Sequence, residues 1–382
     1  VIRLSANRWR ASIGRAKTRS AKASNTAIWT ATRICCAWSA LSVVVRMFDG
    51  DERNRALGIW SALGGGGAAV GVLVGGLLAA GPGWPWVFYV NVPIGVLVFI
   101  VLTRLLPTLP PVETGRRRSA DVLGALLVTA ATGSVIYAVI GAGEAGWLAP
   151  QTLIVFAAGI VLYPLFVWRQ RAAAAPLLDL GLLVRRPVVA GTFVIAIATA
   201  LMVAVFFLGS FYLQNHAGLG PLVTGLLFLP VAIATMVGAQ LGGRAIGTAG
   251  GRGLAIVGLV IAAAGLAVPA IWPSTVGVVV GVSIGSAGIG TLFVVASATA
   301  LGQVAPHEAG VASGIVSTFH EFGASIGAAV ISSIAAASLT TQADGGYIAA
   351  FVVAALAAVA AAVISGALIP GQRPAPASPT AH

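Results

Sequence analysis

One acidic residue, Glu321, lies inside a long apolar stretch of the sequence, where it is suited to carrying protons. In a helix its position is about 18 Å from the start of the stretch, close to the middle of a bilayer. A charge there costs at least about 2.5–3.5 kcal/mol, which favours the protonated carboxyl. His320 is its neighbour. Ser313, Ser317 and Ser325 lie on either side of Glu321 at steps of four residues, so this polar stripe should face protein or water. We expect Glu321, His320 and Ser317 to take part in proton coupling; the alternative is a neutral carboxyl that only holds two helices together.

A second group of residues could bind an organic molecule. It is aromatic and amide in character and ends one apolar stretch: Phe206, Phe207, Phe211, Tyr212 and Gln214. Aromatic faces attract lipophilic cations. We expect Phe207, Phe211, Tyr212 and Gln214 to contact a small-molecule substrate, and the alternative is that they form helix core or an interfacial belt.

Glycines at four-residue spacing form a third pattern. Gly67, Gly71 and Gly75 share one helix face, and Gly76 follows. Such a face lets two helix backbones approach closely. Two further pairs are candidates for the same packing: Gly310 with Gly314, and Gly323 with Gly327.

Other chemistry is poorly supported. Cys35 and Cys36 are adjacent and give no metal-ligand spacing. The G-x-S-x-G match at 281–285 falls inside an apolar stretch rather than at a strand–helix turn. The only lysines, Lys17 and Lys22, follow alanines, so a Gly-Lys-Ser/Thr phosphate loop is missing. We therefore expect no enzyme, cofactor or metal site.

The composition indicates a membrane protein. Hydrophobic residues make up 58% of the 382 residues, charged residues only 8%, and the mean hydropathy is +0.98. A soluble domain has about 25% charged residues. This argues against a soluble enzyme, a nucleic-acid-binding module and a disordered chain, in spite of the net charge of +12.

The apolar stretches predict an all-α, polytopic transmembrane bundle of about ten spans. A bilayer core of about 30 Å needs about 20 helical residues. Spanning strands would alternate in polarity, and that alternation is missing. The expected spans are 56–80, 86–106, 121–141, 149–168, 187–213, 222–243, 253–272, 276–301, 309–337 and 347–369.

The arginines give an orientation. All fourteen beyond Arg33 fall in alternate loops or the C-terminal tail, and none falls in the remaining loops. Positive charge is retained on the cytoplasmic side. This predicts a multi-pass protein of the plasma membrane with a cytoplasmic C-terminus. Asp121 should be a favourable charge at a helix N-terminus. Tryptophans are expected at the opposite interface: Trp84, Trp86, Trp147 and Trp272.

From residue 40 onward, several motifs together resemble the major facilitator superfamily, and in particular its fourteen-helix drug:proton antiporters of the EmrB/QacA type. The matching stretches are 53–60, the glycine-rich 67–76, the Trp84–Gly95 stretch, 211–230 and 310–323. Two details depart from the family pattern. Gly71 is followed by Val72 where the family has proline, and Pro85 replaces an arginine between two tryptophans.

The resemblance implies a division of the chain and a role for several residues. The glycine motif would control proton leak and the direction of exchange, and Arg244 and Arg252 resemble a degenerate cytoplasmic loop motif, or are simple topology anchors. The four helices that normally precede Arg53 are not matched. The expected segments are 1–45 (basic, poorly matching), 46–110 (remnant of the N-terminal bundle), 111–186 (two linking spans), 187–372 (C-terminal six-helix bundle) and 373–382 (cytoplasmic tail).

Residues 1–45 have three interpretations: a targeting segment, a basic arm attracted to anionic lipid, or sequence foreign to the family through truncation or a frame error. The resemblance favours the third.

The expected function is that of a secondary transporter that exports hydrophobic or cationic drug-like compounds in exchange for protons. Its partners would be the lipid bilayer, a small-molecule substrate and protons, with no nucleic acid. The alternatives are a truncated, inactive fragment of such a transporter and a membrane interaction protein that transports nothing.

Overall fold

The computed structural model describes residues 67, 70–105, 121–173, 180–302, 304, 309–341 and 344–369, and all regular structure among them is helical. After the helix Val70–Ala80, the elements are α5 (Pro85–Tyr89), α6 (Asn91–Leu105), α7 (Val122–Ala145), α8 (Pro150–Ala172), α9 (Leu180–Val184), α10 (Arg186–Phe211), the π-helical turn η1 (Tyr212–His216), α11 (Pro221–Leu227), α12 (Leu229–Ile271), α13 (Thr275–Leu301), α14 (Ala309–Thr341) and α15 (Asp344–Leu368). Residues 1–45 and the tail 373–382 lie outside the described residues.

The helices agree with the predicted transmembrane bundle. Seven helical stretches of the described chain are long and apolar enough to cross a membrane, and Val70–Ala80 and Pro85–Val101 are shorter apolar helices. One of the seven, Pro221–Ile271, contains two of the expected spans, 222–243 and 253–272. The part of the expected span 56–80 that precedes residue 67 is outside the described residues.

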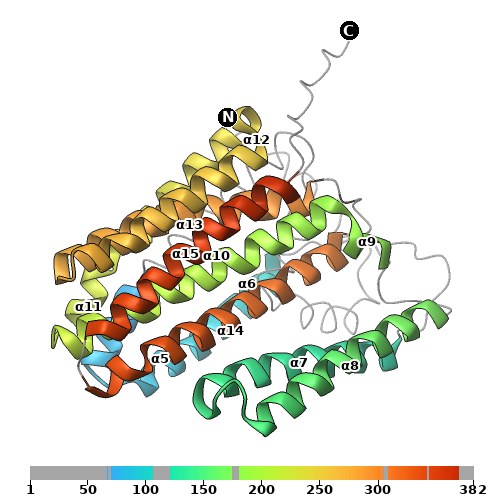
Figure 1. Ribbon diagram of the computed structural model, residues 1–382, viewed down its shortest axis with the longest axis horizontal. Coiled ribbons are helices and arrows are strands. Elements are labelled where there is room, and N and C mark those ends of the chain that lie inside the picture. The colour runs from blue at the N-terminus through green and yellow to red at the C-terminus, as the bar shows by residue number, and fades with distance from the viewer. Residues whose placement is uncertain are drawn as a thin grey trace.

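The chain reverses within α12 at Gly250. This residue has φ 73° and ψ 155°, a backbone conformation that favours glycine, inside an otherwise helical segment. Figure 1 shows the result as a helical hairpin at one end of the bundle. The prediction of a loop over 244–252 was therefore too long, because the helical backbone continues on both sides of this single glycine.

The most densely packed part of the molecule consists of α10 and α12–α15. Its centre contains large side chains that are almost fully buried, such as Ile195, Leu259 and Ile289. Both arms of α12 lie against α13, and glycines form the contacts. A Cβ on Gly238 would collide with the backbone of Ala287. Small residues thus allow the helix backbones to come together, as they do in membrane interiors.

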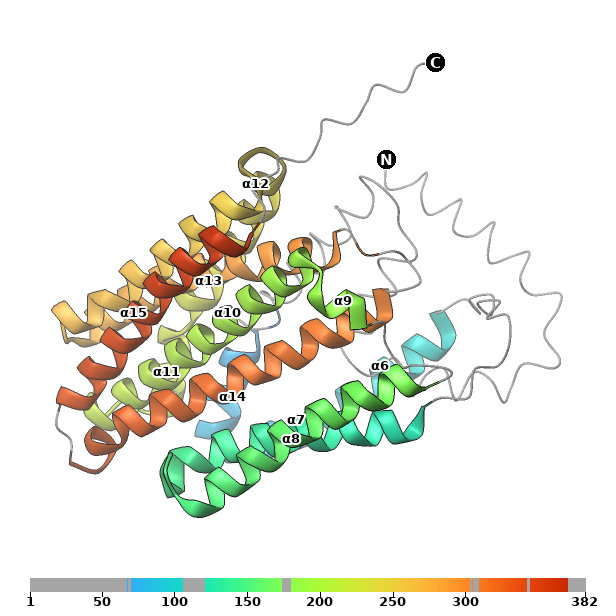
Figure 2. The same cartoon turned by 45° about the vertical axis from the view of Figure 1, so that its right-hand side comes forward.

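The same principle joins α10 to α14, which run side by side in Figures 1 and 2. A Cβ on Gly323 would collide with the backbone of Ala196, and one on Gly327 with that of Ala200. Both numbers rise together, so the two helices are parallel. The prediction of close packing is confirmed for Gly323 and Gly327.

The corresponding contact of Gly310 and Gly314 is not found in the described part of the chain. Among the described residues, nothing comes within 4 Å of a Cβ built on either. Both glycines are exposed on α14. Four-residue spacing alone therefore does not determine which glycines face another helix.

Helices α7 and α8 form a separate hairpin, which Figure 2 shows beside α14. Asp121 caps α7, because its carboxylate accepts a hydrogen bond from the backbone N–H of Gly124 at 3.0 Å. The same buried carboxylate pairs with the Arg169 guanidinium at 3.0 Å and accepts from the Gln170 amide at 3.1 Å. The predicted charge at a helix N-terminus is confirmed, and its two partners at the end of α8 were not foreseen.

The four tryptophans expected at one membrane interface are all exposed and lie at or near helix ends: Trp84, Trp86, Trp147 and Trp272. Amphipathic rings at helix ends are typical of an interfacial belt.

Candidate functional site

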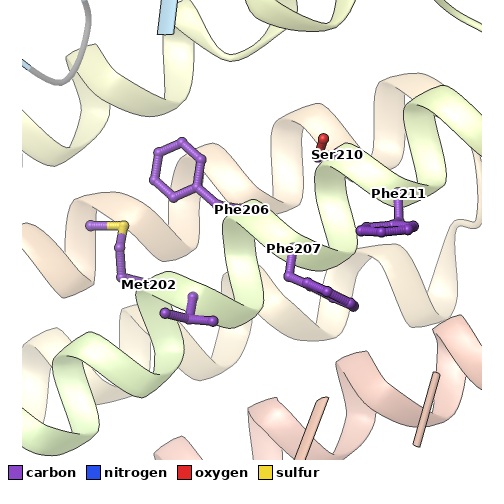
Figure 3. A pocket seen from close by; sticks show the side chains of 6 residues that line it. Met202, Phe206, Phe207, Ser210 and Phe211 are labelled. Atoms are coloured by element: carbon purple, nitrogen blue, oxygen red, sulfur yellow. The ribbon is translucent and has the colours of Figure 1, made fainter. Parts of the chain in front are cut away.

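A hollow of about 410 Å³ lies along α10, in the second half of the helix. Six side chains line it, and all six come from α10: Met202, Val203, Phe206, Phe207, Ser210 and Phe211. Their spacing explains why one helix is sufficient. Residues three and four apart share a helix face, so two adjacent rows result. Figure 3 shows Met202, Phe206 and Ser210 along one row and Phe207 and Phe211 along the other.

The phenyl rings that line the hollow each contact another phenyl ring. Phe206 stacks on Phe228, the last residue before α12, with ring centroids 5.2 Å apart and an interplanar angle of 13°. Phe207 and Phe211 have centroids 4.6 Å apart and are tilted by 30°. The predicted residues Phe207 and Phe211 thus share one wall, and their contact with a substrate stays a prediction.

Tyr212 does not belong to the hollow, which corrects the sequence prediction. It is buried in the core, where its ring meets Tyr347 of α15 edge-on with centroids 6.0 Å apart. Tyr212 continues the buried row of α10, because it follows the buried residues Val205 and Leu208 by seven and four residues. The π-helical turn η1 begins at Tyr212, and the N–H of Ala217 bonds to its carbonyl at 3.0 Å.

Gln214 lies beside the hollow rather than in its lining. Its exposed side-chain amide donates to the hydroxyl oxygen of Ser210 at 2.8 Å. Ser210 and Met202 are lining residues that the sequence analysis missed. Both lie four residues from Phe206, so extending the helical row in both directions would have found them.

Glu321 is on α14, and its side chain is 63% exposed. Its carboxylate lies 3.5 Å from Nδ1 of His320, whose side chain is 31% exposed. The His320 ring in turn lies 6.1 Å from that of Phe293 on α13. The structure shows no hydrogen bond from the Glu321 carboxyl to another described helix. The role of Glu321, in proton coupling or in holding two helices together, stays a prediction.

The serines of the predicted stripe do not form one surface. Ser313 is buried and donates to the carbonyl of Gly310, while Ser317 and Ser325 are half-buried. Ser325 donates to the backbone carbonyl of Glu321 at 2.9 Å. Steps of four drift around a helix, so the first serine turns into the core while Glu321 faces outward.

The face of α14 that carries Glu321 is opposite its seam with α10. Gly323 faces α10, and Glu321 precedes it by two residues, which is about 160° around the helix. Gly314 lies on the same open side and is also exposed. The open face of α14 therefore combines a carboxyl with small residues on a membrane-spanning helix.

The glycine motif has a different contact from the one expected. Gly67, Gly71 and Gly75 have nothing within 4 Å of a built Cβ among the described residues. A Cβ on Gly76 would instead lie 3.1 Å from the carbonyl oxygen of Pro221, and one on Gly225 would lie 3.2 Å from that of Val72. The close approach between this helix and α11 thus involves the face of Val72 and Gly76.

Arg244 and Arg252 are both exposed and lie on the two arms of the α12 hairpin, either side of Gly250. Neither has an ion pair among those that the structure shows for the described residues. Their position suits a topology anchor, and their predicted role as a loop motif stays a prediction. Within the described part of the chain, no three His, Cys, Asp or Glu residues gather as a metal site would require.

Comparison with known proteins gives consistent results. The sequence profile of the Major Facilitator Superfamily matches residues 26–328. The Multidrug resistance protein Stp of Mycobacterium tuberculosis is 34% identical over 315 residues, which are 79% of this chain and 56% of Stp. The Puromycin resistance protein pur8 of Streptomyces alboniger is 33% identical over 321 residues, 81% of this chain and 62% of pur8. The chain thus spans little more than half the length of these relatives.

Among solved structures, the human organic anion transporter MFSD10 (TETRAN) superposes with a TM-score of 0.42 and 13% identity, covering 94% of this chain and 89% of that one.

Proposed function

This chain belongs to the Major Facilitator Superfamily, and from that premise we propose that it exports drug-like small molecules across the plasma membrane in exchange for protons. The superfamily consists of transporters and not enzymes, and relatives of this chain carry names of multidrug and puromycin resistance proteins. The observation that carries the proposal is the aromatic hollow on α10. This hollow is an open, largely apolar depression with a volume of about 410 Å³ on a membrane-spanning helix, and an organic molecule would bind there.

In transporters of this kind, two helix bundles rock against each other around the substrate site. We assign α10–α15, within residues 187–372, to the C-terminal bundle, and α7 and α8 to the linking spans. The helix Val70–Ala80 with α5 and α6 belongs to the N-terminal bundle. The contact between Gly76 and α11 then lies between the two bundles, where the glycine motif would act. The fourteen-helix arrangement is part of this proposal.

Glu321 would supply the coupling to protons. An ionised Glu321 carboxylate on the open face of α14 needs contact with water, whereas a protonated carboxyl can pack against a neighbouring helix. The cost of a charge in the membrane, about 2.5–3.5 kcal/mol, corresponds to about a hundredfold change in an equilibrium. Protonation of Glu321 could therefore shift the balance between a closed and an open arrangement of this face.

The orientation follows from the arginines. The exposed residues Arg244 and Arg252 support a cytoplasmic position for the α12 hairpin, and η1 would then lie outside. Single cysteines at Ala249 and Asn215, in a chain with Cys35 and Cys36 replaced by serine, test this with a membrane-impermeant thiol reagent. In intact cells the reagent should label Asn215→Cys and spare Ala249→Cys until the membrane is opened. The reverse pattern would contradict the orientation.

Transport is tested in bacteria that lack their own drug-efflux pumps. Cells that express the full chain and are preloaded with ethidium or radiolabelled chloramphenicol should lose one or both faster than cells with an empty vector. A protonophore should abolish the difference. Glu321→Gln should remove proton-driven efflux while the protein level in the membrane stays the same.

The matched pair Phe207→Ala and Phe156→Ala separates the site from general damage. Both remove a phenyl ring, but Phe156 is an exposed residue of α8 away from the hollow. Only Phe207→Ala should slow the efflux of chloramphenicol, which carries no charge. If the wild-type chain reaches the membrane and exports neither compound, the proposal is rejected in favour of a chain that does not transport by itself.

A further inference from the structure

Among the described residues, the six side chains that line the α10 hollow are all uncharged, although a neighbouring spanning helix carries the carboxyl of Glu321. Building on the proposed export function, we propose that this hollow binds an uncharged, planar aromatic group with a hydrogen-bond acceptor, and that Glu321 lies outside the binding site. The substrate and the proton would then occupy separate places on the protein.

The ring arrangement favours a flat ligand. Phe206 is fixed by its stacking on Phe228, and Phe207 by its contact with Phe211. Figure 3 shows Phe206 projecting to one side of α10 and Phe207 to the other, so the two rows bound the hollow. Fixed aromatic rings bind flat π-systems by stacking or edge contacts. The thioether of Met202 adds a polarizable contact of the kind that suits aromatic ligands.

One polar group is available for a ligand acceptor. Ser210 lines the hollow, and its oxygen already accepts a hydrogen bond from Gln214 at 2.8 Å. A hydroxyl has one proton to donate and two lone pairs to accept with. The bond from Gln214 uses a lone pair of this oxygen and not its proton, so the Ser210 hydroxyl can also donate to an acceptor such as a ring nitrogen or a carbonyl oxygen of a ligand. Gln214 is thus a positioning residue for Ser210.

The register of α10 and α14 places Glu321 too far away to take part. Gly323 faces Ala196, so Glu321 is level with about residue 194 of the parallel helix α10. At 1.5 Å per residue, Met202 is about 12 Å further along the axis and Phe207 about 20 Å. Glu321 also faces away from α10. An ion pair needs its charged atoms within about 4 Å.

The hollow is open and lies on a membrane-spanning helix, so a cationic ligand there would exchange part of its hydration for an apolar surface and for attraction to the aromatic rings of the described lining. Transfer of an unpaired charge into apolar surroundings is costly. An uncharged ligand of the same shape keeps its stacking contacts and can also accept from Ser210. The difference in charge is the feature that should select between two such ligands.

Two tricyclic probes of nearly equal shape test the inference. Acridine, in a buffer alkaline enough to keep it uncharged, has a ring nitrogen that accepts a hydrogen bond. N-methylacridinium has the same rings, a permanent charge and no acceptor. Equilibrium binding of each is measured by fluorescence on the purified full chain in detergent, with empty micelles subtracted.

We expect acridine to bind at least about tenfold more tightly than N-methylacridinium. Phe207→Ala should weaken acridine binding about tenfold, a typical loss for one stacking ring, while the matched Phe156→Ala leaves it unchanged. Ser210→Ala should weaken acridine about threefold and leave N-methylacridinium unaffected. Glu321→Gln should change neither affinity by more than about threefold, since only a long-range field would be lost.

Equal affinity for the two probes would overturn the inference, and so would a tenfold loss of N-methylacridinium binding in Glu321→Gln, which would put the carboxyl in the site. These outcomes are distinct from failure of the proposed export function. If the chain binds acridine through Phe207 but exports nothing, the binding site is supported and the export function is rejected. If the chain exports compounds while Phe207→Ala binds acridine normally, the export function is supported and the binding site is rejected.

Discussion

Two sets of glycines have the same four-residue spacing, but only one of them packs against another helix of the described chain. On α14, Gly323 and Gly327 lie so close to α10 that a Cβ would collide with its backbone. On the helix Val70–Ala80 and just before it, Gly67, Gly71 and Gly75 have nothing within 4 Å of a built Cβ among the described residues. The comparison shows that spacing creates a flat helix face, while the partner helix decides whether that face is used.

The largest effect should come from filling the closed seam. Gly323→Val would push a branched side chain into the backbone of Ala196, and overpacking of this kind costs about 3 kcal/mol of unfolding free energy. Gly314→Val is a matched control on the open side of the same helix. Thermal unfolding in detergent should show a lower midpoint for Gly323→Val only. Equal midpoints would mean that close packing of α10 against α14 contributes little to the stability of the protein.

Two acidic residues, Asp121 and Glu321, show the same contrast between a buried, partnered position and an exposed one. Asp121 is buried with Arg169 and Gln170 as partners, whereas Glu321 is largely exposed. Asp121→Asn removes the charge from a buried ion pair and weakens the cap of α7, so we expect a loss of about 2 kcal/mol. Glu321→Gln should leave the unfolding free energy nearly unchanged. If Asp121→Asn were as stable as wild type, the contacts of Asp121 with Arg169 and Gln170 would contribute little to the unfolding free energy.

The open glycine face allows a test with the opposite sign. Among the described residues, a methyl group added by Gly71→Ala meets nothing within 4 Å, and the change also removes backbone freedom from the unfolded chain, so it should stabilise the protein by up to about 1 kcal/mol. Gly76→Ala, whose Cβ would lie 3.1 Å from the Pro221 carbonyl oxygen, is the comparison on the packed face and should not stabilise. Chemical unfolding of both variants measures the difference. Destabilisation by Gly71→Ala would indicate that its face does meet a partner.

The smallest effect concerns one hydrogen bond in the α12–α13 seam. The Thr291 hydroxyl donates to the carbonyl of Gly238 at 2.9 Å. Interhelical hydrogen bonds in membrane proteins contribute about 0.6 kcal/mol on average. Thr291→Val should cost about this amount, while Thr248→Val, on the exposed turn of α12, should cost less. A loss above about 2 kcal/mol would show that the seam depends on polar contacts more than on shape.

Much of the fold was predictable because the bilayer imposes simple rules. Apolar length located the helices, and the prediction that Asp121 opens one of them was confirmed by its hydrogen bond to Gly124. The turn at Gly250 was placed in the right region but made too long. A single glycine with positive φ can reverse the chain, and a glycine-rich segment does not reveal which of its glycines does so.

The site was predictable only in part, for a geometric reason. Phe207 and Phe211 line the hollow as a four-residue step suggests, whereas Tyr212 lies on the buried face of α10 that also carries Val205 and Leu208. The Asp121–Arg169 ion pair joins residues from two helix ends, and such a contact depends on how the hairpin folds. Patterns along the chain determine helix faces, whereas contacts between helices require their relative placement.

The most direct test of proton-driven export uses the purified chain in liposomes, with ethidium or radiolabelled chloramphenicol, whichever the cells export. Vesicles with an acidic lumen should accumulate the compound several-fold above vesicles without a pH gradient, and Glu321→Gln should remove this dependence. Equal uptake by the wild-type chain with and without the gradient, or gradient-driven uptake that persists in Glu321→Gln, would contradict the account.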